Sequence, residues 1–264
     1  MVQNINTLRT TYPQLAALLD QLLAKMEAVL GSKRVGVYLY GSLVVGDFDS
    51  EISDIDLLAA IASDLDEIEF AALEQMHGEI VASYPQWNDR IEIAYLSVEG
   101  LQTFKTRRSP IAVISPGEPF NLKDAGADWL MNWYHVREKS VTLFGAPPQE
   151  VIAPISKAEF LQCIRQHAIA WRGRMDDTMS RPYQSYSILT LSRALYTLTH
   201  GEHVSKRQAV EWAAQQMPEW ASTIHDAWVW RSAVHEAADP AATLDNTRHF
   251  VNTVIDKILE QPSL

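Results

Sequence analysis

Cysteine is almost absent from this sequence, and so are long apolar runs. Cys163 is the only cysteine, so no disulfide can form within the chain, as is usual for proteins of a reducing cytoplasm. No apolar run approaches the roughly 20 residues that a membrane helix needs. The N-terminus begins with polar residues instead of a basic and then apolar signal peptide. We therefore expect a soluble cytoplasmic protein without a membrane partner, and we expect it to act as a monomer.

Positive charge is also scarce. Lys and Arg number 22 against 33 Asp and Glu, which gives a formal net charge of −11. Nucleic-acid surfaces depend on clustered Lys and Arg, so this balance argues against a nucleic-acid partner. An acidic surface favours cationic ligands, although the same charge also serves solubility alone.

What the sequence does contain is enough apolar material for one large domain or two modest ones. Hydrophobic residues make up 47% of the 264 residues. Up to about residue 97, helical and strand patterns alternate: helices are predicted over 13–30 and 65–84, and strands over 35–40, 55–61 and 91–96. This order predicts helices packed over a small mixed sheet.

The pattern changes in the second half of the chain. Residues 98–122 contain several Pro and Gly and are interpreted as a loop. Helices are predicted over residues 124–140, 156–177, 185–199, 205–217, 218–237 and 241–259. The predicted fold class is α+β: an N-terminal domain (1–150) with a small mixed β-sheet and flanking helices, followed by a C-terminal all-α helical bundle (151–264).

The residues most informative about chemistry follow the first strand. Gly41 and Ser42 form a turn that opens a short helix, where backbone N–H groups and a hydroxyl can hold phosphate oxygens. After an eleven-residue gap, Asp54 and Asp56 stand two apart on a strand, so both carboxylates share one face. Like charges at about 7 Å are unfavourable without a cation between them, and Mg²⁺ is the hard, oxygen-preferring candidate.

A third carboxylate is expected from a neighbouring strand. Glu92 is an acidic residue between Ile91 and Ile93 in a predicted strand. Sites that transfer phosphoryl or nucleotidyl groups use carboxylates to hold metal ions around the triphosphate. Glu92 is therefore a candidate metal ligand, or the general base that takes the proton of an acceptor hydroxyl.

The joined pattern resembles the nucleotidyltransferase signature of the DNA polymerase β superfamily, in which Gly-Ser precedes Asp-x-Asp. The alternative is a tight turn followed by a strand with solvent-facing acids. A small nucleotidyltransferase of the toxin–antitoxin type shares this core but lacks the long helical half.

The second half is similar to the bacterial aminoglycoside adenylyltransferases that act on streptomycin and spectinomycin. The similar segments are 136–148, 188–198 and 204–213, in the same order along the chain. The resemblance implies an adenylyltransferase whose helical domain closes over nucleotide and acceptor. It further implies transfer of AMP from ATP to a hydroxyl of an aminoglycoside or aminocyclitol, with Mg²⁺ as cofactor and release of pyrophosphate.

The resemblance also implies residue roles. Ser42 and Ser53 contact the triphosphate, and Asp54 and Asp56 bind Mg²⁺ with Glu92 as the base. Arg193 and Lys206 reach the phosphates from the helical domain. Without the resemblance, Arg193 is as easily explained by an interhelical salt bridge, and Lys206 by an exposed helix start.

Trp171 and Asp176 match, at the same spacing, an aromatic residue and a carboxylate that contact the drug, which suits a small cationic acceptor bearing a hydroxyl. Trp171 is equally explained as a buried helix residue. The chain departs from the family at three places. The segment 177–185 is longer than its counterpart, a further drug-site aspartate is replaced near Tyr183, and Arg231 stands where the family has a nucleotide-contacting tyrosine.

Three readings of the function stay open. The leading hypothesis is the aminoglycoside adenylyltransferase. The alternatives are a nucleotidyltransferase acting on another small metabolite or on a protein side chain, and a non-catalytic nucleotide-binding sensor. The intact Asp54, Asp56 and Glu92 argue against the sensor.

Overall fold

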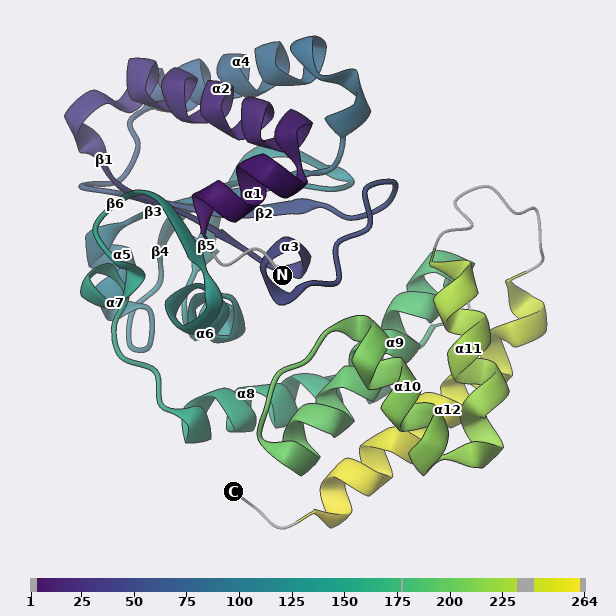
Figure 1. Cartoon of the computed structure of the whole chain (residues 1–264). Coiled ribbons are helices and arrows are strands. Elements are labelled where there is room, and N and C mark those ends of the chain that lie inside the picture. Colours follow the sequence, from purple (N-terminus) through teal and green to yellow (C-terminus); the bar gives the residue numbers. More distant parts are fainter. Residues whose placement is uncertain (1–3, 177, 232–239, 262–264) are drawn as a thin grey trace. The chain divides into compact units, whose positions relative to one another are not determined.

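The chain folds into two compact units, Met1–Ile155 and Ser156–Leu264. The computed structural model describes residues 4–176, 178–231 and 240–261. Figure 1 shows a sheet with covering helices in the first unit and helices alone in the second. The α+β fold predicted from the sequence is therefore confirmed. None of the helices in the described ranges is long and apolar enough to span a membrane.

The N-terminal unit is built on a mixed sheet. Among the described residues, six strands pair in the order β5-β4-β3-β2-β1-β6. The strands β2 and β3 run parallel, and the other neighbours are antiparallel. The strand bounds are β1 Arg34–Tyr40, β2 Ile55–Ile61, β3 Ile91–Ser97, β4 Ser109–Ser115, β5 Glu118–Ala125 and β6 Val141–Gly145.

Helices flank this sheet. Two long ones, α2 and α4, lie along one side of it (Figure 1), and α6 contacts β1. The helix bounds in this unit are α1 Ile5–Thr11, α2 Pro13–Leu30, α3 Ser42–Val45, α4 Glu67–Ser83, α5 Val98–Thr103, α6 Leu130–Lys139 and α7 Pro148–Val151. Short 3-10 turns cover Gly31–Lys33, Pro85–Trp87 and Ala127–Trp129.

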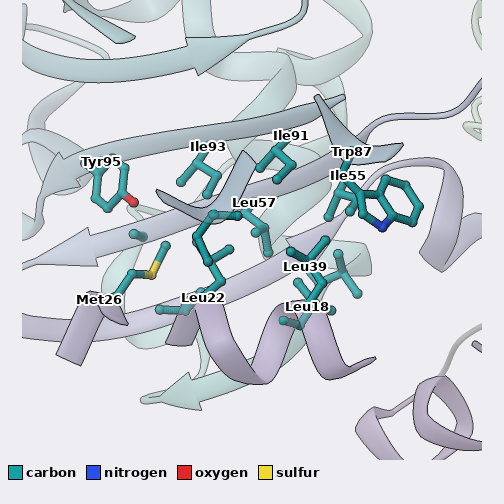
Figure 2. Packing of buried hydrophobic residues seen from close by; sticks show 14 of the residues in the cluster. Leu18, Leu22, Met26, Leu39, Ile55, Leu57, Trp87, Ile91, Ile93 and Tyr95 are labelled. Atoms are coloured by element: carbon teal, nitrogen blue, oxygen red, sulfur yellow. The ribbon is translucent and has the colours of Figure 1, made fainter. Parts of the chain in front are cut away.

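The core of this unit sorts the strand residues onto two faces. Apolar residues of β1, β2 and β3 pack against Leu18, Leu22 and Met26 of α2 (Figure 2). Successive strand residues point to opposite faces of a sheet. Asp56 and Glu92 alternate with these core residues, so their carboxylates lie on the face away from α2.

The predicted loop over 98–122 is wrong. This segment contains α5, β4 and the beginning of β5. The hairpin turns at Pro116-Gly117, where Ser115 pairs with Glu118 and Gly117 has φ of +77°. Proline followed by a residue with positive φ is typical of a tight turn between strands. Pro110, which can donate no hydrogen bond, lies just before the residues of β4 that pair with β3.

The helix predicted over 124–140 begins too early, and a strand after it was missed. Residues 124 and 125 belong to β5, and the α-helix starts only at Leu130. Val141–Gly145 forms the edge strand β6 on β1, for which the sequence predicted no element. An edge strand needs few buried residues, and only Val141 of β6 is buried, so its alternation signal is weak.

The second unit is helical throughout its regular elements. Its helices are α8 Lys157–Ala170, α9 Arg181–His200, α10 Lys206–Gln216, α11 Ala221–Trp230 and α12 Ala241–Glu260, with 3-10 turns at Trp171–Arg174 and Pro218–Trp220. The helix α9 contacts each of the other four. Its Gln184 is fully buried and accepts hydrogen bonds from Thr243 (2.8 Å) and Thr247 (3.0 Å) of α12. The central helix is therefore tied to its neighbour by satisfied polar groups.

Helix ends differ from the predictions at three places. The helix predicted over 185–199 begins earlier, at Arg181. The helix predicted over 156–177 opens with a capping box of Ser156 and Glu159, but it ends at Ala170 and continues only as a 3-10 turn to Arg174. The helix predicted over 218–237 begins as the turn Pro218–Trp220, and its residues 232–237 lie outside the described residues, as does residue 177.

Candidate active site

The turn after β1 is shaped by a glycine. Gly41 has φ of +74°, which disfavours side chains. A Cβ added there would lie 1.8 Å from Oδ2 of Asp56. The backbone at Gly41 thus passes directly against the Asp56 carboxylate, and glycine alone leaves room for both.

Ser42 begins the short helix α3. Its hydroxyl oxygen is buried and makes no hydrogen bond with any residue that the structure describes. A buried polar atom without a partner is costly, so such an atom in a turn points to a ligand or water as its partner. This fits the phosphate role predicted for Ser42.

The predicted carboxylates do meet. One ligand oxygen of each of Asp54, Asp56 and Glu92 lies within 4.8 Å of the others, and all three side chains are half-buried. Strand register brings this about, because Asp56 and Glu92 are direct partners in the parallel pairing of β2 with β3. Three acidic groups this close repel one another unless a cation or a proton lies among them.

The electrostatics of Glu92 reflect this crowding. Burial, and after it the Asp54 carboxylate, raises the pKa of Glu92 from 4.5 to about 7. Nearby Lys123 lowers the pKa and Glu118 raises it. A carboxylate with a pKa near neutrality can both accept and release a proton at physiological pH, which is what a general base requires.

Tyr40 is a neighbour that the sequence interpretation missed. It pairs with Asp56 across β1 and β2, so Tyr40, Asp56 and Glu92 form one row across three strands. Burial and then the carboxylates of Asp56 and Glu92 raise the pKa of Tyr40 well above its usual value, while a hydrogen bond from Asn132 of α6 lowers it. Its only signal in the sequence was its position before Gly41, and it was assigned to a buried strand.

Ser53 lies in the segment between the turn and β2. It is buried, and its hydroxyl oxygen accepts a hydrogen bond from the backbone N–H of Asp49 at 3.0 Å. The Ser53 N–H in turn donates to the carbonyl of Asp49 at 2.9 Å. Ser53 is therefore held inside its own loop immediately before Asp54.

The residues predicted in the helical unit lie on separate elements. Arg193 is in α9 and lies close enough to His167 of α8 to lower, after burial and Arg174, the pKa of that imidazole. Lys206 is the first residue of α10 and lies between Ser205 and Gln208, the two residues of its capping box. Both are half-buried.

Trp171 and Asp176, the proposed acceptor residues, have different surroundings. Trp171 is fully buried, and its ring lies 5.5 Å from that of Tyr183 and 5.7 Å from that of Tyr186. Asp176 is exposed and accepts hydrogen bonds from the N–H and the hydroxyl of Thr178, which lower its pKa. Tyr186, which the sequence interpretation did not select, is half exposed beside Tyr183.

Comparison with known proteins finds similarity to one group of enzymes. Residues 150–257 match the family described as "Aminoglycoside adenylyltransferase, C-terminal domain". An aminoglycoside (3'') (9) adenylyltransferase of Klebsiella pneumoniae is 25% identical over 91% of this chain and 95% of its own length. One from Escherichia coli is 26% identical over 76% of this chain and 78% of its own.

The chain is similar to the aminoglycoside adenylyltransferases along most of its length. It is thus an enzyme of the nucleotidyltransferase type, as the Gly-Ser and Asp-x-Asp pattern indicated. A solved structure of spectinomycin adenyltransferase AAD(9) from Enterococcus faecialis, with ATP and spectinomycin, has the same fold. The two structures superpose with a TM-score of 0.71 at 18% sequence identity. The match covers 92% of this chain and 99% of the spectinomycin adenyltransferase chain.

Proposed function

We propose that this enzyme transfers AMP from ATP to a hydroxyl of an aminoglycoside or aminocyclitol, with Mg²⁺ as cofactor and pyrophosphate as the second product. The observation that carries the proposal is the cluster of Asp54, Asp56 and Glu92 within 4.8 Å, on a chain whose residues 150–257 match an adenylyltransferase family. The named activity and ligands of its relatives support the choice of ATP and of the acceptor class.

The donor set fits the proposed metal. Half-buried carboxylate oxygens are the ligands that Mg²⁺ prefers, and a divalent cation relieves the repulsion among them. Asp54 and Asp56 would hold it, with Glu92 as a third ligand or as the base. When bound, the ion supplies positive charge that stabilises the charge developing on the phosphates.

The chemical step is a displacement at the α-phosphorus of ATP. The acceptor oxygen forms a bond to this phosphorus, the bond to the oxygen bridging to the β-phosphorus breaks, and pyrophosphate leaves. The hydroxyl proton goes to Glu92, whose pKa of about 7 suits transfer at neutral pH. The unpartnered hydroxyl of Ser42 donates to a phosphate oxygen, and Ser53 lines the same loop.

In the helical unit, we assign phosphate contacts to Arg193 and Lys206, since fixed positive charge suits a polyphosphate. Trp171 and Asp176 are the proposed acceptor contacts. The exposed Asp176 carboxylate offers an ion pair to an ammonium or guanidinium group. The half-exposed rings of Tyr183 and Tyr186 offer the faces that cations and sugar rings pack against.

Pyrophosphate release tests the proposal. The purified chain is incubated with each of the four ribonucleoside triphosphates and Mg²⁺, across a panel of streptomycin, spectinomycin and other aminoglycosides. We expect release that needs both ATP and one or more of these acceptors, with a mass increase of the drug by one AMP.

Two outcomes of the same assay would redirect the proposal. ATP turnover only in the presence of a different metabolite or a protein would move the acceptor to one of the alternatives. A nucleotide-binding sensor would be favoured if ATP binds without turnover for any acceptor in the panel and Asp54→Asn binds ATP as the wild type does.

A further inference from the structure

Arg90 joins the two segments that carry the candidate carboxylates. It stands directly before β3, two residues ahead of Glu92. Its carbonyl oxygen accepts the N–H of Ile55, the first residue of β2, at 2.9 Å. The main chain of Arg90 thus continues the pairing of the strand bearing Glu92 with the strand bearing Asp56.

The side chain of Arg90 reaches into the loop before β2. Its Nε donates to the carbonyl oxygen of Ser53 at 3.0 Å, and its Nη2 donates to the same oxygen at 2.6 Å. The Nη2 also donates to the carbonyl oxygen of Ser50 at 2.8 Å. The Ser53 carbonyl belongs to the peptide that leads into Asp54, so fixing this oxygen fixes the plane from which the Asp54 side chain projects.

Aromatic rings hold the other side of this arrangement. The Arg90 guanidinium lies 4.6 Å from the centre of the Trp87 ring. Phe48, in the same loop as Ser50 and Ser53, stacks on Trp87 at 6.3 Å, and Tyr12 meets Phe48 edge-on at 5.3 Å. The loop is therefore fastened at two points, by a ring near its beginning and by a guanidinium near its end.

Only arginine fits all of these contacts. The fork of Nε and Nη2 donates to one oxygen from two nitrogens, while the flat face lies against an indole. A lysine has one nitrogen, which cannot reproduce the two-nitrogen contact and the stacking together. Burial lowers the pKa of Arg90 and the carboxylates of Glu51, Asp54 and Asp49 raise it; a guanidinium keeps its charge in either case.

We propose that Arg90 is a positioning residue that sets the distance between Asp54 and Glu92 by clamping the Ser50–Ser53 carbonyls to the beginning of β3. This inference rests on the proposed function, because it assigns Arg90 to the metal-binding capacity of the same carboxylates. None of the hydrogen bonds described for Arg90 reaches a carboxylate of the cluster, and no ion pair described for it does so. Arg90 therefore takes no part in the chemical step.

The test is metal binding without substrates, with a matched arginine as control. Arg137 of α6 also donates to two main-chain carbonyls, those of Gln149 (2.9 Å) and Ile152 (2.7 Å), in the same unit. Arg90→Lys, Arg90→Met and Arg137→Lys are compared with the wild-type chain. Mn²⁺ binding is measured by electron paramagnetic resonance, and folding by circular dichroism and thermal unfolding.

We expect Arg90→Lys and Arg90→Met to stay folded and to bind Mn²⁺ at least about 10-fold more weakly, the usual scale for residues that orient metal ligands. In turnover, excess Mg²⁺ should recover most of their rate. Arg137→Lys should bind Mn²⁺ like the wild type, whatever stability it loses.

The remaining outcomes decide against the inference in distinguishable ways. Wild-type-like Mn²⁺ affinity in both Arg90 variants overturns the positioning role alone. Loss of folded structure in both makes Arg90 a stability residue and also overturns it. A wild-type chain that binds no Mn²⁺ and transfers no AMP overturns the proposed function, and the Arg90 inference with it.

Discussion

The two units carry their proposed site residues in different ways. In the N-terminal unit, Asp56 and Glu92 are paired residues of neighbouring strands, and Asp54 precedes one of these strands. In the helical unit, Arg193 and Lys206 lie on different helices without any backbone pairing between them. Side chains alternate between the two faces of a strand, so the pairing of two strands tells which residues lie next to each other on one face. Helix packing offers no such rule, so the proposed roles in the helical unit depend on family resemblance.

The largest effect is expected when one carboxylate of the N-terminal unit is removed, and this change tests whether the paired strands carry the catalytic residues. Asp54→Asn and Asp56→Asn should each abolish turnover, because either change removes a ligand charge from the proposed metal site. Each variant should unfold at a higher temperature than the wild type in the absence of metal, since repulsion in the cluster is relieved. Pyrophosphate release and thermal unfolding measure the two effects.

The matched control for this change is Asp20→Asn. Asp20 forms a half-exposed ion pair with Arg9 at 2.6 Å in the same unit and should keep full turnover. Normal activity in either Asp54→Asn or Asp56→Asn would remove the catalytic assignment.

A smaller effect is expected from Glu92→Gln, which keeps the size of the side chain and deletes its basicity. ATP should bind nearly as before, and the chemical step should fall roughly 10²- to 10⁴-fold, the usual share of a general base. Single-turnover rates titrated with Mg²⁺ separate the roles: excess Mg²⁺ restores the rate only if Glu92 acts mainly as a ligand.

Glu92→Gln should also change how the free energy of unfolding depends on pH. Because the folded chain raises the pKa of Glu92 from 4.5 to about 7, the folded state binds this proton more tightly than the unfolded state. The stabilisation is complete below 4.5 and is lost as the pH rises through 7. Without metal, Glu92→Gln should therefore be more stable than the wild type at pH 8. Equal stability of the two chains at all pH values would contradict the raised pKa.

The proposed phosphate contacts of the helical unit are tested by replacing its two cationic residues. Arg193→Ala and Lys206→Ala should each weaken binding of a non-hydrolysable ATP analogue by roughly 1.5–3 kcal/mol, the size of a charge-assisted contact. Calorimetry measures the affinity, and acceptor binding should change much less. Arg165→Ala is a suitable control, because this arginine of α8 contacts only the carbonyls of Leu259 and Gln261 among its described hydrogen bonds. Unchanged affinity in both test variants would place the nucleotide elsewhere.

The last expected effect leaves activity aside and concerns the stability that depends on a histidine in the core of the N-terminal unit. His77 is buried, its Nε2 lies 2.9 Å from the Tyr95 hydroxyl, and burial lowers its pKa to about 4. The unfolded chain thus takes up this proton at a higher pH. Stability should fall as the pH drops from 6.5 to about 4, by at most about 1.4 kcal/mol per pH unit.

His77→Phe should flatten that part of the wild-type curve in chemical unfolding across pH. His167, half-buried in the helical unit, provides the comparison, and its replacement by Gln should change the curve less. A His77→Phe curve parallel to the wild type would show that His77 does not titrate in this range.

The sequence predicted well whatever depends on short-range patterns. Pro13–Leu30 and Ile55–Ile61 have the predicted bounds, and the helix predicted over 156–177 starts at the predicted place. The carboxylate cluster follows from two such strands lying side by side. The missed hairpin of β4 and β5 had a turn signal in Pro116-Gly117, but the surrounding prolines and polar residues hid its alternation.

The residues that surround the carboxylates could not be predicted from local sequence patterns. Tyr40 is an ordinary aromatic residue of a buried strand until its pairing with Asp56 is known. Arg90 is an ordinary polar residue before a strand until its hydrogen bonds to Ser50 and Ser53 are seen. Such roles arise from contacts between residues 16 to 40 positions apart, and no local spacing encodes them.

The closeness of Gly41 to Asp56 links two positions of the signature that lie 15 residues apart in the sequence. Any side chain at 41 would occupy the space of the Asp56 carboxylate, so the glycine is retained for as long as that carboxylate is. When related sequences are sorted into active enzymes and inactive descendants, these two positions should therefore change together. A descendant that has lost the aspartate to a smaller residue is released from the spatial constraint at 41, although the positive φ there still favours glycine. Substitution at this turn thus indicates that the Asp56 carboxylate has been lost.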